Sequence, residues 1–155
     1  MIRGIYMKPK KLREVLEKEL TKKEQEFLTT SFDIIGGIAV IEVKEELWKK
    51  EKVIGEAILD MHKNIHTVCR RDGEHAGVYR TQKLKVIAGK RTKETIHKES
   101  GCNIKLHVEK CYFSVRSGTE RLRIAEMVDK NEDVLVMFSG VAPFVCVIGK
   151  NSAYK

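Results

Sequence analysis

The stretch DVLVMFSGVAPFVCVIGK, residues 133–150, decides the fold class of the second half of this chain. Its apolar run, 134–138, predicts a buried strand over 133–138. After a turn of small residues, Pro143 stands where a helix accepts proline. Strand, turn and helix in this order are typical of the opening of a parallel α/β sheet. A strand buried on both faces needs neighbours that this sequence does not supply, so we expect only the beginning of such a domain.

The turn inside this stretch has the small residues that a ligand-binding loop requires. Gly140 would let a ligand approach the backbone, Ala142 keeps the turn narrow, and the free amides at the helix start would face a bound group. The pattern lacks the three glycines of a G-x-G-x-x-G loop and the lysine and hydroxyl of a P-loop. Taken by itself, the turn therefore fits plain α/β packing better than a ligand site.

The residues before position 115 alternate between helical and extended patterns. In 32–43 a β-branched run is broken by Gly36-Gly37, which indicates two strands around a tight turn or one strand with a bulge. Periodicity further predicts a helix or helix pair over 9–28, helices over 46–65 and 117–128, a strand over 66–71, partly extended chain over 72–93, and a hairpin over 94–114. We predict an α+β N-terminal module, residues 1–114, followed by the start of an α/β Rossmann-like domain, residues 115–155.

Composition narrows the class of protein. The net charge is +8, which suits polyanionic partners, although a soluble domain with a lysine-rich face would have it too. The apolar runs are too short to span a bilayer, and the N-terminus has no apolar segment of a secretion signal, so we expect no membrane partner. Four widely spaced cysteines indicate a cytoplasmic protein with free thiols. The spacing of His62, His66 and Cys69 would allow them to bind a metal ion. A helix end with a buried cysteine explains these three residues as well, and we expect no metal site.

The segment CYFSVRSGTERLRI, residues 111–124, allows two interpretations of Glu120. Ser117 and Glu120 form a capping-box pattern, which would leave Arg121 and Arg123 as solvated charges on the helix surface; this is the simpler interpretation. Alternatively, the arginines keep Glu120 ionised at a helix start, as a general base requires.

A third candidate stretch is HAGVYRTQKL, residues 75–84. Tyr79 could stack on a base, and Arg80 could donate paired hydrogen bonds to an oxygen-rich edge. An ordinary loop arginine is the commoner case.

Five blocks occur in order along the chain: DIIGGIAVIEV, GVYRTQKLKVIAG, ETIHKESG, YFSVRSGTERLRI and VLVMFSGVAPF. Together they resemble the archaeal and eukaryotic tRNA (guanine-37, N1)-methyltransferases, which are class I S-adenosylmethionine-dependent enzymes. The resemblance covers about residues 31–150. It implies a cytoplasmic, monomeric enzyme that binds the tRNA anticodon stem-loop. Its reaction would move a methyl group from S-adenosyl-L-methionine to N1 of the guanosine next to the anticodon.

The resemblance also implies roles for single residues. Glu120 matches the general base, Arg80 the arginine that contacts the guanine, and Tyr112 the active-site tyrosine. The residues that would bind the cofactor are Arg121, Phe138, Gly140 and Val141. From the net charge and the arginine clusters we expect RNA contacts by Arg70, Arg71, Lys98 and Arg116.

The sequence departs from the family pattern at several positions. Val115, Val136 and Ala142 stand where relatives usually have proline, aspartate and glycine, and the family's N-terminal tRNA-elbow-binding domain is missing or reduced to the first helix. The family's ribose-binding acidic residue and its asparagine-proline loop would lie beyond residue 155, so we expect the 155-residue chain alone to be inactive. Two alternatives stay open: a non-catalytic RNA-binding module, and an aminocarboxypropyl transferase of the wybutosine pathway.

Overall fold

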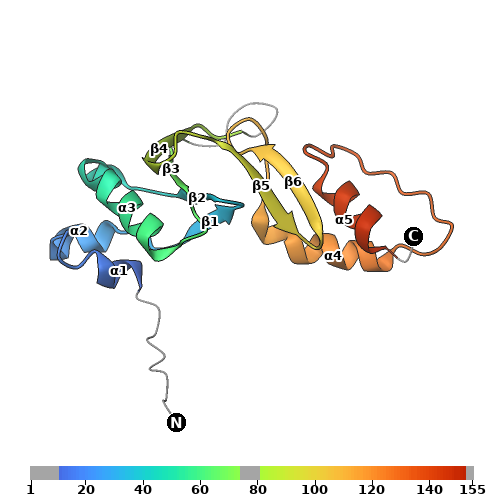
Figure 1. The fold of residues 1–155 in the computed structure, drawn as a ribbon, viewed down its shortest axis with the longest axis horizontal. Coiled ribbons are helices and arrows are strands. Elements are labelled where there is room, and N and C mark those ends of the chain that lie inside the picture. Colours follow the sequence, from blue (N-terminus) through green and yellow to red (C-terminus); the bar gives the residue numbers. More distant parts are fainter. Residues whose placement is uncertain (1–10, 74–80, 153–155) are drawn as a thin grey trace, which may run out of the picture.

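The computed structural model describes residues 11–73 and 81–152, which form a four-stranded sheet, a separate hairpin and helices on both sides (Figure 1). Two short helices, α1 (Leu12–Val15) and α2 (Lys22–Phe27), come first, as the pair allowed by the sequence. The four-stranded sheet has the order β1-β2-β3-β4. Its strands are β1 (Phe32–Ile35), β2 (Ile38–Ile41), β3 (Thr67–Arg71) and β4 (Leu84–Gly89).

Strand β2 is an interior strand of the four-stranded sheet, and both of its edges and both of its faces are covered. It pairs antiparallel with β1 and parallel with β3, and the crossover between β2 and β3 runs through η1 (Glu45–Lys50) and α3 (Glu51–Met61). Side chains alternate between the faces of a strand. Accordingly, Ala39 and Ile41 pack in the cluster with the helices, while Ile38 and Val40 pack in the cluster with the hairpin.

The hairpin joins β5 (Glu94–Glu99) and β6 (Cys102–His107) in antiparallel register. Its two-residue turn has φ of 46° at Ser100 and 76° at Gly101, the positive values that match the twist of paired strands. The predicted hairpin and turn are therefore confirmed, with a second strand shorter than expected. The hairpin's apolar residues Ile104 and Leu106 cover one face of the four-stranded sheet.

The chain then continues through a short helix, η2 (Val115–Ser117), into α4 (Gly118–Met127). Helix α5 (Pro143–Asn151) packs against α4 around Ala125, Val147 and Ile148. Both helices were predicted, and Pro143 does stand in the first turn of α5. None of the described helices is long and apolar enough to cross a bilayer.

The buried strand predicted for 133–138 is wrong. These residues form a loop between α4 and α5 with no strand, and Leu135 and Phe138 are 83% and 99% exposed. Of the apolar run, only Val136 packs, against the α4–α5 cluster. A strand has to share backbone hydrogen bonds with a neighbour. In the described ranges 11–73 and 81–152 no strand lies beside this loop to provide them.

Candidate functional site

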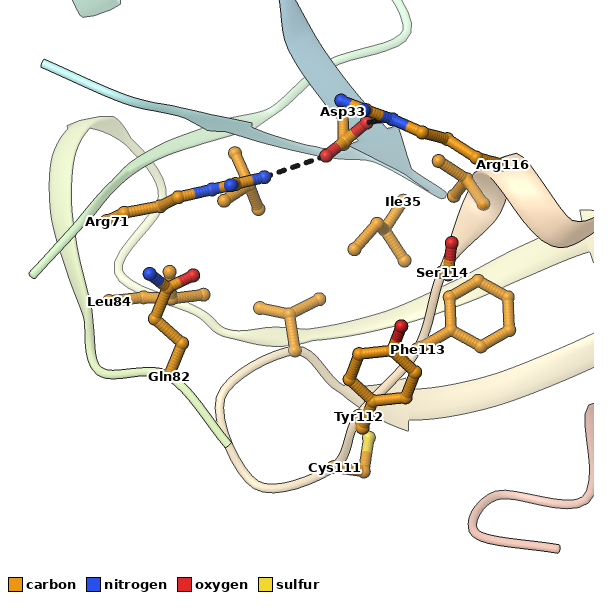
Figure 2. A pocket seen from close by; sticks show the side chains of 13 residues that line it. Asp33, Ile35, Arg71, Gln82, Leu84, Cys111, Tyr112, Phe113, Ser114 and Arg116 are labelled. Carbon is orange, nitrogen blue, oxygen red and sulfur yellow. Dashed lines mark hydrogen bonds and ion pairs between the residues drawn. The ribbon is translucent and has the colours of Figure 1, made fainter. Parts of the chain in front are cut away.

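A pocket of about 220 Å³ lies where the four-stranded sheet meets the chain that follows the hairpin (Figure 2). Apolar residues from β1, β2 and β4 form one part of its lining, and the segment 111–116 forms another. Six side chains with oxygen or nitrogen groups also line it: Asp33, Arg71, Gln82, Tyr112, Ser114 and Arg116. A pocket with an apolar wall and a few convergent polar groups is the usual form of a ligand site.

The polar groups of this pocket are ordered by one carboxylate. Arg71 donates from Nη2 to Oδ2 of Asp33 at 2.8 Å, and Arg116 donates from Nε to Oδ1 at 3.0 Å. The pocket thus brings together three of the residues predicted for the site, Arg71, Tyr112 and Arg116. Arg80, which was also predicted for the site, lies outside the described residues.

Glu120 lies on α4 and is not part of the pocket lining. Its two oxygens accept from Nε and Nη2 of Arg123, at 2.8 and 2.7 Å. The hydrogen bonds from Arg123 lower the pKa of the Glu120 carboxyl from its usual value. The side chain is therefore ionised at neutral pH, as a proton acceptor has to be.

The predicted capping box at the start of α4 is wrong. Ser117 is the N-cap residue, but its side chain makes no capping hydrogen bond, and its φ of −88° and ψ of 6° differ from the extended backbone of a capping residue. The Glu120 carboxylate goes to Arg123, one turn further along the helix, because a charged guanidinium is a stronger donor than a backbone amide. The role of helix cap therefore no longer competes with a chemical role for Glu120.

Arg121 is not the solvated surface charge that the capping-box interpretation gave it. It is 2% exposed and donates from Nε and Nη2 to the two oxygens of Glu99, both at 2.6 Å, and from Nη2 to the carbonyl oxygen of Ser114 at 3.0 Å. Its guanidinium also lies 5.1 Å from the ring centroid of Phe113. Hydrogen bonds from Arg121 lower the pKa of Glu99. The pair fixes α4 to the hairpin and to the chain that lines the pocket.

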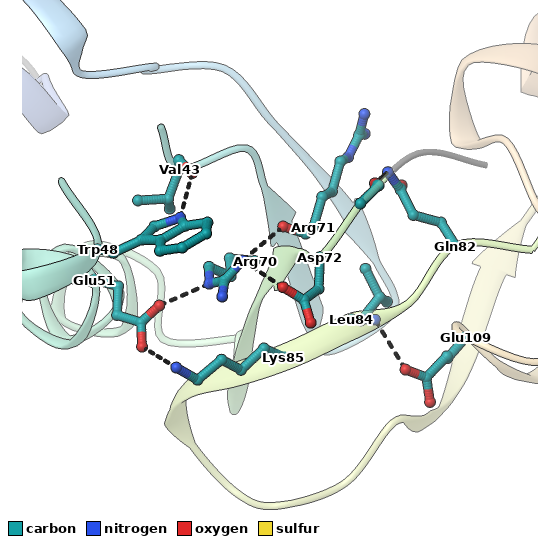
Figure 3. Close-up of polar contacts among 11 residues, drawn as sticks. Val43, Trp48, Glu51, Arg70, Arg71, Asp72, Gln82, Leu84, Lys85 and Glu109 are labelled. Atoms are coloured by element: carbon teal, nitrogen blue, oxygen red, sulfur yellow. Dashed lines mark hydrogen bonds and ion pairs between the residues drawn. The ribbon is translucent and has the colours of Figure 1, made fainter. Parts of the chain in front are cut away.

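The remaining predicted RNA contacts differ in exposure. Lys98 is exposed on β5. Arg70 is buried, and its guanidinium lies over Trp48, donates to Glu51 at 2.7 Å and donates to Asp72 at 2.8 Å (Figure 3). Arg70 thus has its hydrogen-bond partners inside the fold, and its contact with RNA stays a prediction.

The predicted cofactor turn has unusual backbone geometry. Phe138, Gly140 and Ala142 have φ of 54°, 56° and 57°, and the amide of Ala142 donates to the carbonyl of Ser139 at 2.7 Å. A side chain added at Gly140 would meet no other atom within 4 Å, so the backbone there is open to a ligand. Val141, like Phe113 and Val115, packs against the buried cluster between the four-stranded sheet and the hairpin. Among residues 11–73 and 81–152 no group of three or more side chains could hold a metal ion.

Sequence reasoning missed two residues that organise the site, Asp33 and Glu99. Each is an acidic residue inside one of the five family-like blocks and in an extended stretch: Asp33 lies between Phe32 and Ile34, and Glu99 ends the alternating run 94–99. A carboxylate within a half-buried strand needs a cationic partner, and the arginines of the other blocks were available. That signal could have pointed to both, although it does not choose between the arginines.

Two family models together match nearly all of the described chain. The TYW2 N-terminal domain matches residues 12–92, and the TRM5/TYW2 methyltransferase domain matches residues 95–155. The first model therefore covers the sheet with α1 to α3, and the second covers the hairpin, α4 and α5. The predicted division at residue 115 stays a prediction.

Relatives of known sequence and structure agree with these matches. The tRNA (guanine(37)-N(1))-methyltransferase Trm5b of Pyrococcus abyssi is 44% identical over 148 residues, and its crystal structure superposes with a TM-score of 0.82, covering 96% of this chain. An aTrm5 complex with tRNALeu is 32% identical with a TM-score of 0.81, covering 98% of this chain and 47% of that one. Pyrococcus horikoshii TYW2 in complex with MeSAdo is 28% identical with a TM-score of 0.65, covering 90% and 49%.

The chain spans 44% of the length of the P. abyssi relative. Within that span the two folds superpose, and the two family models meet between β4 and β5. On these grounds the chain belongs to the TRM5/TYW2 family.

Proposed function

We propose that this chain serves a tRNA (guanine-37, N1)-methyltransferase, in which it receives the guanosine and supplies the base that removes its N1 proton. The observation that carries the proposal is the pocket of Figure 2, which Arg71, Tyr112 and Arg116 line; the last two lie on the segment that leads directly into the helix of Glu120. The 44% identity to Trm5b of P. abyssi supports methylation as the reaction.

In this proposal each residue has one task. Tyr112 is 57% exposed and presents its ring at the pocket for stacking on the base. The ionised Glu120 takes the proton from N1. Arg80, outside the described residues, would stabilise the negative charge that develops on the guanine oxygen.

The cofactor would bind at the turn that precedes α5. The open backbone of Gly140 and the fully exposed ring of Phe138 fit a ligand that lies against this turn, and Val141 links the turn to the pocket-lining cluster. S-adenosylmethionine, when bound, supplies an electrophilic methyl group. Arg121 acts through Glu99 and Ser114, because its guanidinium is buried among them, and it would orient the cofactor side of the site indirectly.

The partner would be the anticodon stem-loop of a tRNA. Lys98 and Arg116 are exposed cations, and the net charge of +8 favours a polyanion. A cytoplasmic monomer is the state that we propose for the protein.

The decisive experiment joins residues 1–155 to the remaining part of the P. abyssi relative and measures single-turnover methylation of a tRNA that carries guanosine 37. Glu120→Gln should lower the rate by about 100-fold or more, the usual share of a general base. Melting should barely change, because the carboxylate is half exposed and its pair with Arg123 is on the surface. Glu126→Gln, an exposed glutamate on the same helix, is the matched control and should leave the rate unchanged. A Glu120→Gln rate within about threefold of the parent would contradict the assignment.

The match of residues 12–92 to a TYW2 domain favours a second candidate, the aminocarboxypropyl transferase of the wybutosine pathway. The same chimera distinguishes the two reactions when the cofactor carries its label either on the methyl group or on the carboxypropyl group. Transfer of the methyl label alone supports methylation. Transfer of neither label, with RNA binding retained, would indicate the non-catalytic RNA-binding module.

A further inference from the structure

Asp33 joins three segments of the chain at the edge of the pocket. It lies on β1 with its side chain 19% exposed, and it accepts one hydrogen bond on each oxygen. The donors come from β3, at Arg71, and from η2, at Arg116, which are 38 and 83 positions away in sequence. Asp33 therefore determines where both guanidinium groups stand relative to the pocket.

The bonds to Asp33 leave most donors of the two arginines available. A guanidinium has five N–H groups, and each arginine gives one of them to Asp33. The Arg116 side chain is 75% exposed, so its terminal nitrogens are accessible to a ligand. The Arg71 side chain is 33% exposed. Its Nε is buried without a hydrogen-bond partner in the part of the chain that the structure describes, so the donors that Arg71 can offer to a ligand are on its terminal nitrogens. Two cations around one anion also leave the cluster with a net positive charge.

We propose that Asp33 is a positioning residue that holds Arg71 and Arg116 as a clamp for an RNA phosphate beside the base pocket. This inference rests on the proposed function. A guanidinium binds phosphate best through paired, directional hydrogen bonds, and a long side chain that is already fixed loses less freedom on binding. Asp33 provides that fixation for both arginines at once.

For Asp33→Asn, positioning and simple electrostatics predict opposite changes in RNA affinity. Asp33→Asn removes a negative charge near the proposed RNA site, which by charge alone would strengthen binding to a polyanion. If Asp33 acts by positioning, the same change releases two arginines and weakens binding. With the 155-residue chain and a labelled anticodon stem-loop RNA, fluorescence anisotropy should show about tenfold weaker binding. In the variant the two long side chains become ordered only when RNA binds, and the conformational entropy that they lose lowers the affinity.

A matched control separates position from charge. Asp60→Asn makes the same chemical change at an exposed residue of α3, so it alters the net charge equally and should leave binding at or slightly above the parent level. The slope of log affinity against log salt should fall in Asp33→Asn by about 0.7 to 1.4, the loss of one or two phosphate contacts. A merely structural role for Asp33 would not change that slope. Asp33→Glu, which restores a carboxylate, should recover part of the affinity.

A second variant tests the clamp without touching Asp33. Arg116→Lys keeps the charge at an exposed position, so the fold is unaffected, but lysine lacks the planar pair of donors. We expect it to weaken RNA binding several-fold, and to add little further loss in the Asp33→Asn background because the two act as one unit. Binding by Asp33→Asn as tight as the parent, or an unchanged affinity of Arg116→Lys, would overturn the inference alone. A parent chain that binds no RNA would overturn the proposed function as well.

Discussion

Two apolar runs of nearly the same character have opposite fates in this molecule. Ile38–Ile41, IAVI, is buried at every position as strand β2, whereas 134–138, VLVMF, forms an exposed loop between α4 and α5 (Figure 1). Strand β2 has β1 and β3 on its edges, α3 over one face and the hairpin over the other. Among the described residues, the second run packs only against the α4–α5 cluster, and it does so through Val136.

The difference shows that an apolar, β-branched sequence favours a strand, but that the strand forms only where neighbouring elements pair with it and cover it. Backbone hydrogen bonds and two covering layers make β2 a strand, and neither is a property of its four residues. The contrast between the two runs can be tested by removing buried contacts around β2 and the hairpin, or by relieving backbone strain in the turn that follows 134–138.

The largest effect is expected where the buried region is fixed to α4, the element that leads into the exposed loop. Arg121→Met leaves the Glu99 carboxylate, 10% exposed, without its cation, and breaking one partner of a buried pair costs about 3 kcal/mol or more. Urea unfolding followed by circular dichroism measures the loss. Arg123→Met, on the exposed side of the same helix, is the control and should change stability little. A loss below about 1 kcal/mol for Arg121→Met would mean that the pair is no stronger than a surface one.

The contrast itself is tested by the same truncation in both runs. Ile41→Ala, at a residue 1% exposed, should cost about 3 kcal/mol through lost burial and the cavity it leaves. Leu135→Ala, at a residue 83% exposed, should stay within about 0.5 kcal/mol of the parent. Chemical denaturation of both variants gives the comparison directly. Equal losses would show that the run 134–138 is packed as well as β2.

Acid should lower the free energy of unfolding by a smaller amount, through Glu99 on the hairpin. The hydrogen bonds from Arg121 hold the pKa of Glu99 below its usual 4.5, so the folded state binds that proton less readily than the unfolded chain. The resulting stability is fully present above about pH 4.5 and is lost as the pH falls through the lower folded value. Thermal melting between pH 7 and pH 3 should show this decline. In Glu99→Gln the contribution of this residue to the slope should vanish.

The smallest effect is expected at the turn before α5. Ala142 has φ of 57°, a left-handed conformation that disfavours residues with a Cβ atom. Ala142→Gly should therefore stabilise the chain by about 0.5 kcal/mol, because relief of this strain exceeds the extra freedom that glycine gives the unfolded state. Ala125→Gly, in the buried interior of α4, should destabilise instead. A loss of stability in Ala142→Gly would refute the strain.

The sequence predicted those parts of the fold whose causes are local. The β1–β2 pair, the hairpin around Ser100-Gly101 and the helix that begins at Pro143 all depend on neighbouring residues, and all three are present. Glu120 shows the limit even at short range. The Ser-x-x-Glu pattern suggested a cap, but Arg123, three residues further on, is the better partner.

The organising contacts of the site could not be predicted because their partners are distant in sequence. Arg116 reaches Asp33 across 83 positions and Arg121 reaches Glu99 across 22, so no local pattern joins them. The resemblance to a family directed attention to Tyr112, Glu120 and the arginines. It was the folded chain that showed which carboxylates hold the arginines in place.

The turn between β1 and β2 has a consequence for any exchange of parts between relatives. Gly36 donates its amide to Nδ1 of His97 at 3.2 Å, Gly37 donates to Oγ1 of Thr95 at 3.0 Å, and a Cβ atom on Gly36 would collide with Thr95 and the backbone of Ile96. These contacts join the part matched by the first family model to the part matched by the second. A chimera that joins two relatives between β4 and β5 must therefore keep the two glycines together with Thr95 and His97. Otherwise the two parts will not pack against each other.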